Sequence, residues 1–191
     1  ALVSAAGFGT SGAFAKSLLE AGWSPGGAVT VRIGGAALAL LVPAAVALRG
    51  NWRVLLRHGR MLSVYGLVAV AACQFAYFNA VTRLSVGVAL LLEYLAPVLL
   101  IGWMWVRHGE RPTRVTIAGS ALAIAGLVFV LDVTGSVEVD AIGVVWALAA
   151  AVSVAVYFTL SAREPEGLPP LVMSAAGMVV ATGALLALGA V

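Results

Sequence analysis

Residues 86–106 read VGVALLLEYLAPVLLIGWMWV, and this stretch decides the fold class. It holds one charged residue, Glu93, among about 20 positions, the length that a helix needs to cross the hydrocarbon core of a bilayer. A membrane span must satisfy every backbone N–H and C=O internally, which leaves only helices and closed barrels. Barrel strands alternate polar and apolar side chains over about 10 residues, and this stretch does not. It therefore predicts a transmembrane helix.

The rest of the chain repeats this pattern, with short connectors rich in Gly, Pro and charged residues between apolar runs. We expect an all-α integral membrane protein with about seven transmembrane helices. The predicted spans are Ala1–Leu19, Gly27–Leu48, Met61–Val81, Val86–Val106, Val115–Leu131, Ala141–Ser161 and Leu168–Ala190. Because the first and last spans begin and end at the chain termini, we interpret the chain as an excerpt of a longer protein.

The overall composition supports the same class. Of the 191 residues, 62% are hydrophobic and 10% are charged, whereas soluble domains are about 45–50% apolar and about 25% charged. The net charge of +3 does not indicate nucleic-acid binding, because the arginines form no basic stripe with interleaved aromatic residues. The single cysteine, Cys73, lies inside an apolar run, where we expect a buried thiol and no disulfide.

No motif in the chain indicates an enzyme. The sequence contains no phosphate-binding loop, no metal-ligand spacing on one helix and no paired acidic motif. We therefore expect no catalytic residues, no metal and no cofactor.

The charged residues predict the orientation in the membrane. Eight arginines lie in or beside the second, fourth and sixth connectors, whereas Arg83 is the one arginine on the opposite side. Short loops rich in Lys and Arg stay in the cytoplasm. We therefore expect a multi-pass plasma membrane protein whose residue 1 end is cytoplasmic. The eight arginines are Arg49, Arg53, Arg57, Arg60, Arg107, Arg111, Arg114 and Arg163.

A weak internal repeat points to a transporter. Segments Gly9–Pro25 and Val152–Pro169 share a helix of small residues, an aromatic residue, a polar break and a proline. An odd number of spans separates the two segments, so the second copy runs through the membrane in the opposite direction. Inverted repeats of this kind are typical of transporters, which bind their substrate at the repeat interface.

Several short motifs resemble the third-to-fifth helix signature of EamA-type transporters of the drug/metabolite transporter superfamily. They are FAYFNA at 75–80, LSVGVAL at 84–90, LAP at 95–97 and GERPT at 109–113. Arg32 also matches a common position of that family, and Leu92-Glu93-Tyr94 resembles the branch that exports threonine and homoserine.

The resemblance implies a fold and a function. Family members usually have ten spans in two five-helix repeats, so residues 1–133 would form the first repeat and residues 134–191 would begin a truncated, inverted second repeat. The implied function is secondary transport of an amino acid or similar metabolite across the plasma membrane, by efflux coupled to an ion gradient. The implied partners are the lipid bilayer, a small-molecule substrate and protons, and a homodimer is left open. The alternative is a non-transporting membrane scaffold or sensor.

Three charged residues inside predicted spans are the candidate site. Glu93, Arg32 and Lys16 all lie in the outer half of their spans, and Glu93 is the deepest, roughly 10 Å in at 1.5 Å per residue. A charge near the bilayer centre costs at least about 2.5–3.5 kcal/mol, so it usually faces the interior of the bundle and has a partner. Pro97 removes the N–H that would bond the carbonyl of Glu93, so we expect a kink there.

Each candidate also has a structural interpretation. Glu93 suits binding of a proton or an ammonium group, or it pairs structurally with Arg32, which could instead bind a substrate carboxylate. For Lys16 we favour an interfacial position, with its charge reaching toward the headgroups. Gln74 and Tyr77 share one helix face and either line a cavity or bond a neighbouring helix.

Overall fold

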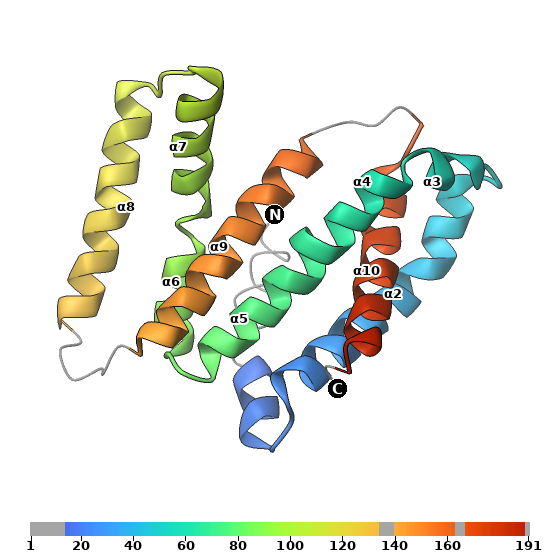
Figure 1. The fold of residues 1–191 in the computed structure, drawn as a ribbon, viewed down its shortest axis with the longest axis horizontal. Coiled ribbons are helices and arrows are strands. Elements are labelled where there is room, and N and C mark those ends of the chain that lie inside the picture. The colour runs from blue at the N-terminus through green and yellow to red at the C-terminus, as the bar shows by residue number, and fades with distance from the viewer. Residues whose placement is uncertain (1–13, 134–139, 163–166, 190–191) are drawn as a thin grey trace.

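The computed structural model describes residues 14–133, 140–162 and 167–189 (Figure 1). Within these ranges the chain forms helices and turns and no strand. Five described helices are long and apolar enough to cross a membrane: Pro25–Leu48, Gly59–Val81, Val86–His108, Ala141–Ser161 and Pro170–Ala187. The predicted all-α membrane class is confirmed.

These five helices coincide with five of the seven predicted spans to within a few residues. For one of them, Ala141–Ser161, the predicted and observed bounds are identical. The predicted fifth span falls on α8, Arg114–Val133. The predicted first span lies mostly outside the described residues, which show only residues 14–19 of it as helix.

Local sequence signals set the helix ends. Before α2 (Pro25–Leu48), the Ser24 side chain accepts a hydrogen bond from the N–H of Gly27 at 2.9 Å, and Pro25 occupies the first turn. Before α9 (Ala141–Ser161), Asp140 accepts from the N–H of Ile142 at 2.8 Å and also pairs with Arg83 at 2.8 Å. That ion pair ties the start of α9 to the connector at residues 82–85, between the third and fourth spans.

The third span is one continuous rod with an unusual middle. It begins with α4 (Gly59–Val64), continues as the π-helix η1 (Tyr65–Ala72) and ends as α5 (Cys73–Val81). A short helix, α3 (Arg53–Arg57), precedes it. π-Helical segments are uncommon and often accompany functional sites. We therefore expect a functional site near η1.

The fourth span is broken in its middle. Its first part, α6 (Val86–Glu93), ends at the buried carboxylate, and its second part, α7 (Ala96–His108), begins with Pro97 in its first turn. Proline has no N–H to donate to the carbonyl of Glu93. The chain instead tightens, and the N–H of Leu95 bonds the carbonyl of Leu92 at 3.1 Å.

Two helices organise the packing. α9 lies against η1, α5, α6 and α7, whereas α10 (Pro170–Ala187) lies against α2, α4 and η1 (Figure 1). One close crossing joins η1 to α10: a Cβ atom on Gly66 would lie 2.6 Å from the carbonyl oxygen of Gly177, and a Cβ atom on Gly177 would overlap the Tyr65 ring. Glycine at both positions lets the two backbones approach.

The connectors gather at two ends of the bundle. The α2–α3 and α7–α8 connectors lie at one end, and the α5–α6 connector and the start of α9 lie at the other (Figure 1). This arrangement separates the described connector arginines, such as Arg49 and Arg111, from Arg83, as the predicted orientation requires. Arg163 lies outside the described residues, as do residues 9–13 of the first repeat segment and 163–166 of the second, and the inverted repeat stays a prediction.

Candidate functional site

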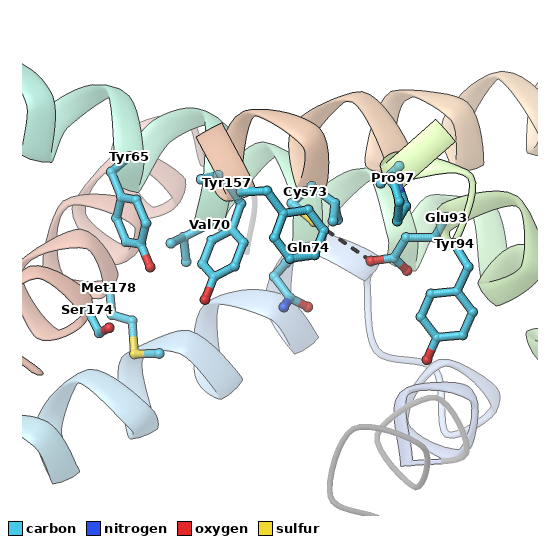
Figure 2. A pocket seen from close by; sticks show the side chains of 14 residues that line it. Tyr65, Val70, Cys73, Gln74, Glu93, Tyr94, Pro97, Tyr157, Ser174 and Met178 are labelled. Atoms are coloured by element: carbon cyan, nitrogen blue, oxygen red, sulfur yellow. Dashed lines mark hydrogen bonds between the residues drawn. The ribbon is translucent and has the colours of Figure 1, made fainter. Parts of the chain in front are cut away.

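A cavity of about 400 Å³ lies beside the break in the fourth span. Side chains of η1, α5, α6, α7, α9 and α10 line it, so it is the place where most of the described spans meet (Figure 2). Its polar lining residues are Tyr65, Cys73, Gln74, Glu93, Tyr94, Tyr157 and Ser174.

Glu93 is the one carboxylate among the residues that line this cavity. It is the last residue of α6, is 5% exposed and lies 4.0 Å from the Cys73 sulfur, measured from Oε1 to Sγ (Figure 2). Cys73 is buried, as predicted, and its sulfur also lies 4.0 Å from the carbonyl oxygen of Ala150. Among the described residues, the ion pairs within 4.0 Å are Lys16–Glu20 and Arg83–Asp140, so Glu93 has no cation at that distance.

Arg32 reaches the same region from α2. Its Nη1 donates to Oε1 of Gln74 at 3.1 Å, and its guanidinium carbon lies 5.9 Å from the centre of the Phe78 ring. Arg32 interacts electrostatically with Glu93 without forming a close ion pair. Gln74 therefore links Arg32 to the cavity wall, because Gln74 lines the cavity and Arg32 does not.

Tyr77 lies one turn beyond Gln74 and is buried, with 5% of its surface exposed. Within the described part of the chain, its hydroxyl has no hydrogen-bond partner. It interacts electrostatically with Glu93 and Arg32, although it does not line the cavity. A buried hydroxyl without a partner is costly, so this position departs from the usual pairing of buried polar groups.

Lys16 does not join this group. Its side chain is half exposed, and its Nζ lies 3.9 Å from Oε1 of Glu20, one turn along the same helix. It is absent from the lining of the cavity. This geometry fits the interfacial interpretation of Lys16. The structure thus brings together Glu93, Gln74, Arg32 and Tyr77 and leaves Lys16 outside.

Three hydroxyl-bearing lining residues were not anticipated from the sequence: Tyr65, Tyr157 and Ser174. They come from η1, α9 and α10, which are far apart along the chain. The available signal was a hydroxyl-bearing side chain in the middle of an apolar run, but that signal occurs at many positions and does not show which of them face one another. In the described parts of the chain, no group of three or more His, Cys, Asp and Glu residues is placed to hold a metal ion.

Comparison with known proteins adds one family. The model of the EamA-like transporter family matches residues 1–132. No curated protein and no solved structure matches the chain. The match does not reach a branch within the family, so the resemblance to exporters of threonine and homoserine stays a prediction.

Proposed function

The chain belongs to the EamA-like transporter family, and on this basis we propose that it is a secondary transporter that exports an amino acid or a similar metabolite, coupled to an ion gradient. Family membership makes it a membrane transporter of the drug/metabolite superfamily. The substrate, the efflux direction, the coupling and the plasma membrane location are parts of the proposal. So is the division into a first repeat over residues 1–133 and the start of a second over 134–191.

The observation that carries the proposal is the position of Glu93. A charge at this depth costs at least about 2.5–3.5 kcal/mol, and membrane proteins usually offset that cost with a close partner. Glu93 lines a cavity, and no cation lies within 4.0 Å of it in the described part of the chain. A proton or the ammonium group of a solute would neutralise it there.

Competition for one carboxylate supplies a coupling mechanism. A proton and an ammonium group cannot both neutralise Glu93, so the arrival of one releases the other. If the cavity opens to each side of the membrane in turn, an inward proton gradient drives the solute outward. The break between α6 and α7 lies directly after Glu93, where a change in helix direction can alter which side the carboxylate faces.

Gln74 and Arg32 supply the complementary charge. The Gln74 carbonyl oxygen accepts from Arg32, which leaves the Gln74 amide NH₂ group as a donor for a solute carboxylate. The positive charge of Arg32 behind it favours an anionic group at that position. A zwitterionic solute would then place its amine on Glu93 and its carboxylate toward Gln74.

The test is Glu93→Gln in proteoliposomes. This variant keeps the shape of the side chain and cannot be charged, so we expect it to insert normally and to lose transport driven by a proton gradient. Counterflow exchange should weaken as well, because the ammonium group of the solute loses the carboxylate that binds it. Glu110→Gln is the matched control, since Glu110 is an exposed connector residue. Undiminished gradient-driven flux in Glu93→Gln would leave the carboxylate with a structural role only.

The alternative is a scaffold or sensor that transports nothing, and its structural requirements differ from those of a transporter. A scaffold needs tightly packed helices and gains nothing from a cavity that reaches a buried carboxylate. The cavity beside Glu93 therefore counts against a scaffold, and the family match favours a transporter over a sensor.

A further inference from the structure

The cavity has a second polar end. In Figure 2, Glu93 lies at one end of the labelled residues and Tyr65 and Ser174 lie at the other, with Cys73, Gln74 and Tyr157 between them. Tyr65, Tyr157 and Ser174 line this end, the ring centres of Tyr65 and Tyr157 are 5.8 Å apart, and Ser161 and Ser174 belong to the surroundings of the Tyr65 side chain. We refer to these four residues as the hydroxyl cluster.

The wall between the two ends is mainly apolar. Ala69, Val70, Val154 and Met178 line it, and they come from η1, α9 and α10. Tyr65 and Cys73 are eight positions apart on the same rod, so their backbones are separated by about 12 Å or slightly less, at a helical rise of about 1.5 Å per residue. The cavity is thus polar at both ends, and its largely apolar middle is interrupted by Gln74 and Tyr157.

The hydroxyl cluster is held by tight packing. Tyr65 is 4% exposed, and its ring lies against Gly177 of α10, where a Cβ atom would overlap it. On the other side its ring centre is 5.8 Å from that of Tyr157. Contacts with two different helices fix the direction of the phenol group.

Hydroxyl groups between helices can simply join the helices to one another. That role places them in a closed interface. Here Tyr65, Tyr157 and Ser174 all line the cavity, and Tyr157 is 38% exposed, so three of the four members can reach a molecule inside it. If one end of a solute binds Glu93 and the solute fills the cavity, its other end must therefore contact the hydroxyl cluster.

We propose that the hydroxyl cluster is a second binding subsite, which recognises an uncharged polar group at the far end of a solute whose amine is held by Glu93. The preferred substrates are then amines with an apolar body and a terminal hydroxyl or similar group. This inference rests on the proposed function, because it takes Glu93 as the amine site.

The subsite predicts discrimination between two amines that differ by one hydroxyl group. Tyramine carries a phenolic hydroxyl opposite its amine, and 2-phenylethylamine lacks it. A site built to hydrogen-bond a hydroxyl rejects the analogue that lacks it, because its own polar groups then stay unpaired. We expect the purified protein in nanodiscs to bind tyramine roughly tenfold more tightly than 2-phenylethylamine, the effect of about one hydrogen bond.

Variants of the hydroxyl cluster test its role. Tyr65→Phe and Ser174→Ala, alone and together, should weaken tyramine binding toward the affinity of 2-phenylethylamine and leave the latter unchanged. Retained binding of 2-phenylethylamine also shows that each variant is folded. Ser153→Ala is the matched control, because the Ser153 hydroxyl bonds the Ala149 carbonyl of its own helix and does not line the cavity.

The outcomes separate this inference from the proposed function. Equal affinities for the two amines in the unaltered protein, or an undiminished preference in the double variant, would overturn the subsite. In that case, if Glu93→Gln also abolishes binding of both amines, the proposed role of the carboxylate is supported although the proposed role of the hydroxyl cluster is wrong. If neither amine binds the unaltered protein, the inferred class of substrate is wrong.

Discussion

Arg32 on α2 donates to the side-chain oxygen of Gln74 on α5 at 3.1 Å, across 42 positions of sequence. This bond fixes the Gln74 amide at the cavity wall and places a positive charge behind it. It also gives Arg32 a role that does not require a close ion pair with Glu93. The transport site is therefore expected to respond to changes at a residue that does not itself line the cavity.

Replacing Arg32 should impair transport much more than replacing Lys16. A hydrogen bond to a charged group contributes about 1.5–3 kcal/mol, so Arg32→Ala should lower the transport rate by roughly tenfold or more. Lys16→Ala should have a mild effect, because Lys16 pairs with Glu20 outside the cavity. Both rates are measured in proteoliposomes at matched protein content. Equal, unaltered rates for the two variants would remove Arg32 from the site.

Gly66→Ala should destabilise the bundle. The added Cβ atom would lie 2.6 Å from the Gly177 carbonyl oxygen and 2.7 Å from the Val180 Cβ atom. Relieving such contacts in a packed core costs about 1–3 kcal/mol, and we expect thermal unfolding in detergent to shift to a lower temperature. Gly35→Ala is the control, because nothing lies within 4 Å of its added Cβ atom. An unaltered unfolding temperature for Gly66→Ala would show that η1 and α10 do not pack this closely.

The ion pair between Arg83 and Asp140 should persist into mildly acidic solution. The hydrogen bond from Arg83, together with those from the backbone N–H groups of Ile142 and Gly143, holds the pKa of Asp140 below its usual value. A lowered carboxyl pKa contributes stability above the ordinary aspartate range, and this contribution is lost as the pH falls through the lowered value.

Two substitutions at Asp140 separate the ion pair from the helix cap. Asp140→Asn keeps an oxygen that can cap α9 and removes the charge, whereas Asp140→Ala removes both. We expect unfolding temperatures in the order Asp, Asn, Ala at neutral pH, and in strong acid the advantage of Asp over Asn should disappear while that of Asn over Ala remains. If Asn and Asp give the same unfolding temperature at neutral pH, the pairing with Arg83 adds no stability.

Labelling of engineered cysteines tests the orientation. Asn51 and Thr82 are exposed in connectors at opposite ends of the bundle (Figure 1). In intact cells, Thr82→Cys should react with an impermeant thiol reagent, and Asn51→Cys should react only after the cells are opened. The unaltered protein gives the background, because its single cysteine, Cys73, is buried. The reverse pattern would invert the predicted topology.

Much of the fold could be predicted from the sequence because membrane insertion depends on local composition. The helix Ala141–Ser161 has the bounds that its apolar run indicates, since polar and charged residues outside the run stay in water. Glu93 could be singled out for the same reason, because a lone carboxylate in a long apolar run is costly to insert and is therefore expected to serve a function or to have a partner.

The sequence alone determined the membrane class and most of the spans, and it singled out Glu93 as a candidate site residue. Only the tertiary structure decided that Arg32 meets Gln74, that Lys16 stays outside and that Tyr65 turns toward Tyr157 and Ser174. The physical reason is that hydrophobicity sets where a helix begins and ends along the chain, but hardly constrains its rotation about its own axis. Close contacts between small residues set that rotation, as at Gly66 and Gly177, and these depend on pairs of helices far apart in sequence.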